Sequence, residues 1–424
     1  MSYLLDLVRR HHAGAAVGIY SVCSAHPLVI EATLRQAAVS GSPALIEATS
    51  NQVNQDGGYT GLRPADFRDL VRQIAARAGL PAERVILGGD HLGPNCWQQL
   101  PAAAAMDKAQ ALVEQYVAAG FHKIHLDCSM PCAGDALPLT DAVIASRAAR
   151  LCAAAERVWP THGGAAPVYV LGSEVPTPGG AHESLHGIEV TSAHAALDTI
   201  NAHRSALNVA GIPDVWQRVI GLVVQPGVEF DHDKVVDYAR GKARALKSFI
   251  ESQSTLVYEA HSTDYQSPAS LNQLVHDHFA ILKVGPGVTF ALREAVWALD
   301  QIEREWLGEA RSSRVRETLL NVMRVDPRHW QKYYDTQGDA LTRQLQYSLS
   351  DRIRYYWPVP AVAAAVNQLL HNLDEDPPAL SLLSQYLPNE YGAIRAGRLA
   401  LRTRDLIMHH VGLVLTQYAD ACRL

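Results

Sequence analysis

The sequence lacks the features that would place the chain in a membrane, on nucleic acid or in a disulfide-stabilised scaffold. No apolar run reaches the roughly 20 residues that span a bilayer, and the N-terminus shows no signal-peptide core. The net charge is −6 without any basic block, which makes nucleic acid and anionic membranes poor partners. The 6 cysteines form no C-x-x-C pair, so disulfides are not expected and a cytoplasmic location is predicted.

Two nucleotide-binding motifs are also absent. No apolar run is followed by G-x-G-x-x-G, the dinucleotide fingerprint, and no G-x-x-x-x-G-K-[ST] phosphate loop occurs anywhere. These absences disfavour both a hydride-transfer enzyme that uses NAD and a nucleotide-dependent kinase.

What the sequence does contain is a regular alternation of short apolar runs and helix-like segments. The chain has 424 residues and 48% of them are apolar, enough for one large barrel with appendages or for two domains. The apolar runs span 16–23, 44–47, 85–88, 123–126, 168–172, 219–224, 255–258 and 280–284. Eight such runs separated by helices predict a (β/α)8 TIM barrel over residues 1–305, with an open doubly wound sheet as the alternative.

The pattern changes after residue 305. The remaining segments read as helical or irregular, and aromatic residues concentrate between Trp330 and Trp357. We therefore predict that residues 306–424 form a C-terminal helical extension packed on the barrel.

Polar residues follow the apolar runs rather than precede them. The stretch 86–95 is the clearest case, because Gly88 and Gly89 should end a strand and expose Asp90 and His91 at its end. In a barrel the carboxyl ends of all strands meet at one face, so the following residues should surround one pocket. They are His26, Glu47, Asn51, Asp90, His91, Asp127, Glu174, Gln225, His261 and Ser262.

Some of these residues suit a divalent metal ion. Two imidazoles with a carboxylate and one further oxygen ligand fit Zn, Mn or Co. We predict His91, Glu174 and His261 as ligands, with Gln225 or Asp127 as the fourth. Each residue has an ordinary alternative as a strand-end histidine or a solvated loop acid.

One further imidazole, His125, lies within the fourth apolar run. Ile124 and Leu126 alternate with it, and side chains along a strand point to opposite faces in turn. We therefore expect His125 to point out of the barrel.

A phosphate site is expected near the last two strands, where barrels often bind phosphate through glycine amides and a helix N-terminus. An ordinary turn would explain the same glycines, and the arginines of the extension could equally serve an interface or internal ion pairs. The predicted substrate-binding residues are His26, Asn51, Ser262, Thr263, Gly285, Gly287, Arg352 and Arg354.

Several long motifs then identify a resemblance that covers nearly the whole chain. They are SVCSAHP (21–27), IEATSNQVNQ (46–55), GGDHLGPNCW (88–97), KIHLD (123–127), VVQPGVEFDH (223–232), YEAHSTDYQ (258–266) and SLSDRIRYYWP (348–358). Together they closely resemble the GatZ/KbaZ family, whose members are known as the non-catalytic subunit of class II D-tagatose-1,6-bisphosphate aldolase. Close relatives are D-tagatose 6-phosphate 4-epimerases, and the label tagatose-6-phosphate kinase also circulates.

The resemblance implies a barrel of the class II aldolase type and a set of roles. In those enzymes an Asp-His pair after a strand supplies a proton-transfer aspartate and a metal-binding histidine, and Asp90 and His91 look like its counterparts. Glu174 and His261 look like the further ligands. Gln225 stands where the aldolases have a histidine, which would leave the metal more electrophilic or change its identity.

Chemistry then favours one activity among these relatives. The C4 proton of a 2-ketose is not acidic, so inversion at C4 needs either oxidation or cleavage and re-formation of the C3–C4 bond. We expect the second route, with Asp90 moving the proton of the C4 hydroxyl and Glu47 or Asp127 acting on the opposite face. The loops 51–61 and 179–187 are candidate lids that would keep the fragments in place.

The sequence therefore predicts a metal-dependent ketohexose-phosphate 4-epimerase that interconverts D-tagatose 6-phosphate and D-fructose 6-phosphate in galactitol or tagatose catabolism. The second hypothesis is a non-catalytic subunit that stabilises a separate aldolase chain. The oligomeric state is left open, a homo-oligomer included.

Overall fold

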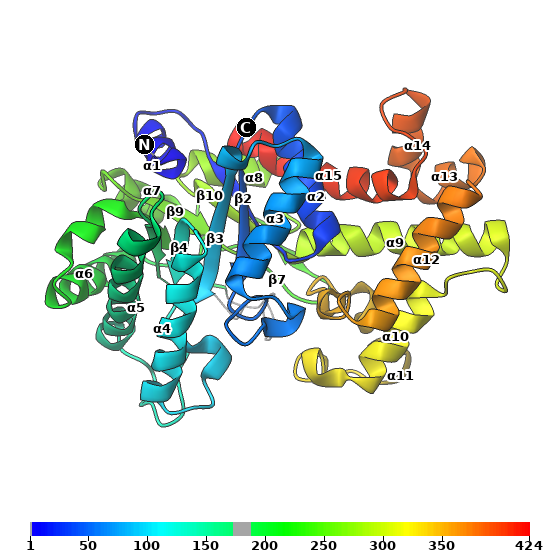
Figure 1. Cartoon of the computed structure of the whole chain (residues 1–424). Coiled ribbons are helices and arrows are strands. Elements are labelled where there is room, and N and C mark those ends of the chain that lie inside the picture. Colours follow the sequence, from blue (N-terminus) through cyan, green and yellow to red (C-terminus); the bar gives the residue numbers. More distant parts are fainter. Residues whose placement is uncertain (1, 173–187) are drawn as a thin grey trace.

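The centre of the molecule is a closed, all-parallel barrel of eight strands (Figure 1). A computed structural model describes residues 2–172 and 188–424. The barrel strands are β1 (Ile19–Cys23), β2 (Ala44–Thr49), β3 (Val85–Leu92), β4 (Lys123–Leu126), β5 (Val168–Leu171), β6 (Val219–Val223), β9 (Val257–Ala260) and β10 (Ile281–Val284). They pair in the order β1-β10-β9-β6-β5-β4-β3-β2. Each predicted apolar run overlaps one barrel strand, and the predicted (β/α)8 fold is confirmed.

Helices surround the barrel, and their ends follow from local sequence. The helix α3 begins at Pro64 and buries Phe67, Val71 and Ile74 at helical spacing. It ends before Gly79, whose backbone adopts the left-handed conformation. The surrounding helices are α2 (Pro27–Ser40), α3 (Pro64–Ala78), α4 (Ala102–Ala118), α5 (Asp141–His162), α6 (Ala193–Val209), α7 (Arg244–Glu251), α8 (Pro268–His276) and α9 (Pro286–Leu307). A short hairpin of β7 (Glu229–Phe230) and β8 (Val235–Val236) follows β6.

The N-terminal end of the barrel is closed by α1 (Tyr3–His12). Its Leu4, Leu7 and Val8 are buried in one apolar cluster with the residues that line the strand beginnings, such as Ile19 and Ile86. The open end of the barrel is therefore the opposite one, where the strands finish and the polar residues were expected.

The C-terminal part is helical and forms a lobe beside the barrel (Figure 1). It comprises α10 (Val315–Val325), α11 (Gly338–Tyr347), α12 (Pro360–Glu375), α13 (Leu380–Tyr386), α14 (Pro388–Arg395) and α15 (Thr403–Cys422). The last helix returns to the barrel and packs against α2, α8 and α9. Its Tyr418 donates a hydrogen bond to the carbonyl of Thr263 at 2.7 Å. The predicted extension is present, and the domain division at residue 305, which falls inside α9, stays a prediction.

The strand β3 does not end at Gly88 and Gly89 as expected, but continues to Leu92. Its register with β4 shifts between Gly89 and Leu92, and His91 has a left-handed φ of 47°. The glycines are required by packing, because a Cβ on Gly88 would lie 2.6 Å from Glu47 Oε1 and one on Gly89 2.6 Å from Leu92 Cδ1. The irregularity lets Asp90 and its neighbour His91 both face the same site, which a regular strand would not allow.

The expectation that His125 points out of the barrel is wrong. Lys123 and His125 both point inward, since Lys123 contacts Glu47 and Glu259 in the barrel interior and His125 contacts Asp90. Ile124 and Leu126 instead belong to the apolar layer between strands and helices. Both faces of a barrel strand are buried. In β4 the aliphatic residues face the surrounding helices, and the polar residues face the barrel interior.

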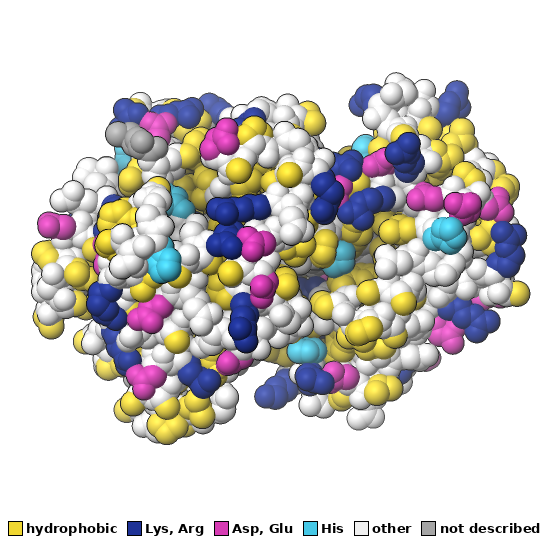
Figure 2. Space-filling model, in the orientation of Figure 1, with side chains coloured by type: hydrophobic (Ala, Val, Ile, Leu, Met, Phe, Trp, Pro, Cys, Tyr) yellow, Lys and Arg dark blue, Asp and Glu magenta, His cyan; other side chains and the backbone are white. Residues whose placement is uncertain are grey.

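The molecular surface agrees with the absence of a basic block. Figure 2 shows Lys and Arg interspersed with Asp and Glu over the face drawn, without a large area of one sign. Among the described residues, no helix is long and apolar enough to cross a membrane.

Candidate active site

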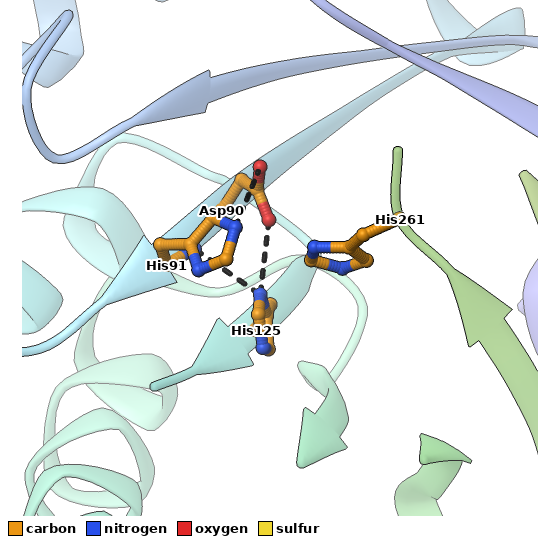
Figure 3. Close-up of side chains that lie close together, drawn as sticks. All are labelled: Asp90, His91, His125 and His261. Carbon is orange, nitrogen blue, oxygen red and sulfur yellow. Dashed lines mark hydrogen bonds and ion pairs between the residues drawn. The ribbon is translucent and has the colours of Figure 1, made fainter. Parts of the chain in front are cut away.

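Four buried side chains converge at the mouth of the barrel (Figure 3). Asp90 and His91 come from the end of β3, His125 from β4, and His261 from the residue after β9. Each offers one possible ligand atom, and these atoms lie within 4.8 Å of one another. The ring centroids of His91 and His261 are 4.8 Å apart. The structure thus brings together the two histidines that were predicted to share a site.

Each imidazole of this barrel-mouth cluster (Asp90, His91, His125 and His261) has one nitrogen hydrogen-bonded to an acceptor outside it. His91 Nδ1 lies 2.7 Å from Asp127 Oδ2, and His261 Nε2 lies 2.9 Å from Glu259 Oε1. His125 Nε2 lies 3.1 Å from the carbonyl of Gly172. Carboxylate and carbonyl oxygens only accept, so each of these nitrogens carries a proton, and the other nitrogen of a neutral ring can accept a hydrogen bond or bind a metal.

The arrangement of acceptors fits a cation. His125 Nδ1 accepts from the His91 amide at 3.2 Å and also lies 2.9 Å from Asp90 Oδ1. Two acceptors at this distance repel unless a proton or a metal ion lies between them. The three imidazoles are a donor set suited to Zn, Mn or Co, with the Asp90 carboxylate beside them. The residues present therefore fit a divalent ion.

A layer of buried ion pairs lies directly beneath the cluster. Lys123 Nζ is 2.6 Å from both Glu47 Oε1 and Glu259 Oε2. Lys283 Nζ pairs with the other oxygen of Glu47 and lies 2.8 Å from Asp90 Oδ1. Three carboxylates thus face two ammonium groups beside the imidazoles. Burial would lower the pKa of His91, but Asp90 and Asp127 outweigh it and raise that pKa, so this surrounding attracts a positive charge, whether a proton or a metal ion.

The ionisation of the cluster follows from these contacts. Burial would raise the pKa of Asp90, but the Lys283 ammonium and the neighbouring imidazoles hold it well below its usual range. Burial lowers the pKa of His261 to about 3, against the opposing effect of Glu259. At neutral pH Asp90 is therefore a carboxylate and His261 a neutral imidazole, the forms that bind a metal.

Replacing the central ammonium of the layer should destabilise the fold strongly. The Lys123→Met variant leaves Glu47 and Glu259 facing each other without their shared partner, and we expect the free energy of unfolding to fall by about 3–5 kcal/mol. Urea denaturation measures it. The matched control is Lys108→Met, because the Lys108 side chain is 44% exposed and pairs with an exposed Asp56. A loss no larger than that of the control would contradict a structural role for the ion pairs.

The cluster opens into a small cavity of about 80 Å³. Of the predicted substrate-binding residues, Asn51, Ser262, Gly285 and Arg354 line it. The other lining residues are Cys23, Thr49, Gln52, Tyr59, Asp90, His91, Phe230, His261, Asp264, Lys283, Val284, Pro286 and Tyr355. Arg354 and Tyr355 come from the extension, which therefore forms one wall of the site.

Other predicted residues lie outside this cavity. His26 lines an adjoining cavity of about 410 Å³ between the barrel and the extension. Thr263 is buried and donates to the carbonyl of Lys283, and the Arg352 guanidinium lies 3.3 Å from the centre of the Tyr333 ring. Gln225 uses its side-chain oxygen to accept from the amides of Gly227 and Val228. Among the described residues, the barrel-mouth cluster contains His125 and not Gln225.

The three residues predicted to be catalytic lie in different surroundings. Asp90 lines the cavity, whereas Glu47 is fully buried in the ion-pair layer. Asp127 is bound to His91 Nδ1 and also accepts from the amide and hydroxyl of Ser129. Burial would raise the pKa of Asp127, but the hydrogen bond to His91 outweighs burial and the pKa is lowered to about 2. Glu174 lies outside the described residues.

The glycine amides expected to bind phosphate are already occupied. Asp264 Oδ1 accepts from the amides of Gly285 at 2.9 Å and Gly287 at 2.7 Å. Burial raises the pKa of Asp264 to about 6 although these amides lower it. A phosphate at these amides would have to displace that carboxyl group, so the geometry favours the Arg354 side of the cavity for an anion.

Sequence reasoning missed His125, Lys123, Glu259 and Lys283. The available signal was charge within apolar runs, since Lys283 interrupts a strand of aliphatic residues and Lys123 precedes His125 by two positions. A charged residue at the centre of a buried strand usually has an ionic partner on the same face.

Comparison with known proteins decides the family. The model of the D-tagatose-1,6-bisphosphate aldolase subunit GatZ/KbaZ-like family matches residues 4–423. The chain belongs to the GatZ/KbaZ-like family. A structure described as a probable tagatose 6 phosphate kinase from Sinorhizobium meliloti 1021 is 48% identical, with a TM-score of 0.88, and the match covers 96% of this chain and 100% of that one.

More distant structures also align with this GatZ/KbaZ-like chain. Fructose-bisphosphate aldolase from Campylobacter jejuni is 13% identical with a TM-score of 0.47, covering 87% of this chain and 91% of that one. The YdjI aldolase from Escherichia coli K12 is 10% identical with a TM-score of 0.43, covering 90% and 96%.

Proposed function

We propose that this chain is a metal-dependent 4-epimerase that interconverts D-tagatose 6-phosphate and D-fructose 6-phosphate by breaking and re-forming the C3–C4 bond. The observation that carries the proposal is the convergence of Asp90 with His91, His125 and His261 at the barrel mouth, where Asp90, His91 and His261 line a cavity. Membership of a family described by tagatose-bisphosphate chemistry supports the choice of substrate.

The substrate dictates the bond to be broken. The hydrogen on C4 is not adjacent to the C2 carbonyl, so removing it would give an unstabilised carbanion. Removing the proton of the C4 hydroxyl instead lets C4 become an aldehyde while the C3–C4 electrons pass into an enediolate over C2 and C3. Turning the aldehyde before the bond re-forms inverts C4 without an oxidant.

The residues of the cavity can be assigned to this reaction. Asp90 is the base, because it is ionised, lines the cavity and is held by Lys283. A divalent ion bound by the barrel-mouth cluster would act as a Lewis acid and stabilise the negative charge that develops on the substrate. Arg354 lines the cavity opposite the barrel, and its guanidinium suits the phosphate of the substrate.

Two other activities are less well supported. A kinase needs a site for the nucleotide phosphates, and the sequence contains no phosphate-loop motif. A subunit that only stabilises a separate aldolase chain is favoured by the family description. It leaves unexplained why three imidazoles and a carboxylate would be gathered and buried at the barrel mouth.

Activity of the isolated chain tests the proposal. Purified protein with Mn²⁺, Zn²⁺ or Co²⁺ is expected to convert D-tagatose 6-phosphate to D-fructose 6-phosphate without any partner. Detection of fructose 6-phosphate by a coupled assay measures the conversion. Absence of activity of the chain alone, together with an increase in the stability of an added aldolase chain, would favour the subunit hypothesis instead.

A further inference from the structure

Epimerisation by bond cleavage needs two proton-transfer groups. The C4 oxygen occupies one position before the aldehyde turns and another afterwards, and each position needs a group that can take or give its proton. Asp90 serves one of them. Glu47 and Asp127 do not serve the other, because Glu47 lies in the ion-pair layer and Asp127 is bound to His91 and Ser129. The second group therefore has to be sought among the other side chains of the cavity.

Tyr355 is placed for this role. It ends the short helix η6 (Arg352–Tyr355) of the extension and lines the same cavity as Asp90 and His261. Its ring stacks on His329 with centroids 4.8 Å apart and an interplanar angle of 5°. Tyr59 packs against it edge-on at 4.7 Å. These contacts hold the ring in one orientation at the barrel mouth.

The phenol oxygen of Tyr355 accepts hydrogen bonds from two guanidinium groups. Arg354 Nη2 lies 3.2 Å from it and Arg352 Nη1 lies 3.5 Å from it. Both contacts stabilise a phenolate, and both leave the hydroxyl's own proton free to be transferred. The guanidinium of Arg354 also lies 4.7 Å from the centre of the ring.

The groups around the phenol favour its ionisation. Burial would raise the pKa of Tyr355, but Arg354 and Arg352 outweigh it and bring the pKa below its ordinary value. For the neighbouring Tyr59, burial outweighs the opposing effect of Arg354 and raises the pKa. The other titratable groups nearby are His329, whose pKa burial lowers, and the buried Asp351.

We propose that Tyr355 is the second acid–base residue of the proposed epimerase, transferring the C4-hydroxyl proton in the epimer that Asp90 does not serve. In one direction Asp90 takes the proton from O4, the C3–C4 electrons pass to C2 and C3, and O4 becomes a carbonyl. After the aldehyde turns about C4–C5, C3 attacks its other face and O4 takes the proton from the Tyr355 hydroxyl. Solvent exchange returns Asp90 and Tyr355 to their starting forms, and nothing is oxidised or reduced.

The test is the Tyr355→Phe variant, which keeps the ring and removes only the hydroxyl. We expect kcat to fall by about 10²- to 10⁴-fold while the affinity for the divalent ion is unchanged. The matched control is Tyr347→Phe, because Tyr347 also accepts from an arginine, Arg316, but is 45% exposed on the extension. The control should keep wild-type turnover.

Ultraviolet titration of tyrosinate separates an acid–base role from a structural one. The wild-type protein and the Tyr347→Phe control should show one tyrosine that ionises below the ordinary range, and Tyr355→Phe should lack it. Full turnover by Tyr355→Phe would overturn the inference and leave the epimerase proposal intact. A slow variant without any missing ionisation would also overturn it, because Tyr355 would then act only by position. A wild-type chain without epimerase activity would remove both proposals.

Discussion

Asp90→Asn is expected to lower kcat by about 10²- to 10⁴-fold, because the amide cannot accept the proton of the C4 hydroxyl. The substitution preserves the size of the side chain, and its remaining oxygen can still accept from Lys283, which lies 2.8 Å from the carboxylate in the wild type. The loss should therefore appear in kcat more than in KM. Steady-state kinetics on D-tagatose 6-phosphate in both directions measures it.

The control for this variant is Asp107→Asn. Asp107 has a side chain that is 72% exposed and pairs with Arg150 on the outside of the barrel. It should keep the wild-type rate, which excludes a general effect of removing one carboxylate. If Asp90→Asn turned over at the wild-type rate, Asp90 would not be the base.

The second large expected effect is weaker binding of the divalent ion when one of its histidines is removed. We expect His91→Ala and His261→Ala each to weaken binding of Zn²⁺, Mn²⁺ or Co²⁺ by more than about 100-fold, because loss of even an outer hydrogen-bond partner of a ligand costs roughly 10- to 100-fold. Calorimetric titration of metal into the protein measures the affinity directly. A chelator should abolish the wild-type activity, and adding the metal back should restore it.

An exposed histidine provides the comparison. The His194 side chain is 83% exposed and pairs only loosely with Asp198 on α6, at 3.4 Å. His194→Ala should therefore bind metal with wild-type affinity. If His261→Ala bound metal as tightly as His194→Ala, the cluster would not be the metal site.

The barrel could be read from the sequence because its signal is repeated. Eight apolar runs alternate with helices, and helix ends such as Pro27 and Gly79 are marked by proline and glycine. A single missed run would not have changed the fold. The convergence of polar residues also follows from topology, since all carboxyl ends of a parallel barrel meet at one face.

The details of the site were harder to predict because they depend on which face of each strand points inward. The alternation of Lys123, Ile124, His125 and Leu126 is the same for either orientation, and the aliphatic pair was wrongly assigned to the interior. The bulge at Gly89 likewise decides that Asp90 and His91 share one site. Neither feature has a local sequence signature, because both depend on contacts with other strands.

The groups that accept hydrogen bonds from backbone amides are equally hard to predict from local sequence. Gly285 and Gly287 resemble a phosphate-binding turn in the sequence, but Asp264, which lies 21 residues before Gly285 in the loop after β9, accepts from both amides. The contribution of Arg354 and Tyr355 from the extension also required the tertiary structure, since the motif containing them lies beyond the barrel.

The most direct test of the central claim is to follow the isolated chain acting on D-tagatose 6-phosphate in heavy water by nuclear magnetic resonance. Cleavage of C3–C4 keeps the hydrogen of C4 in place as the aldehyde hydrogen. The account predicts D-fructose 6-phosphate formed in the presence of the divalent ion alone, with no deuterium at C4. Absence of conversion until a second protein chain is added, or deuterium at C4 of the product, would contradict it.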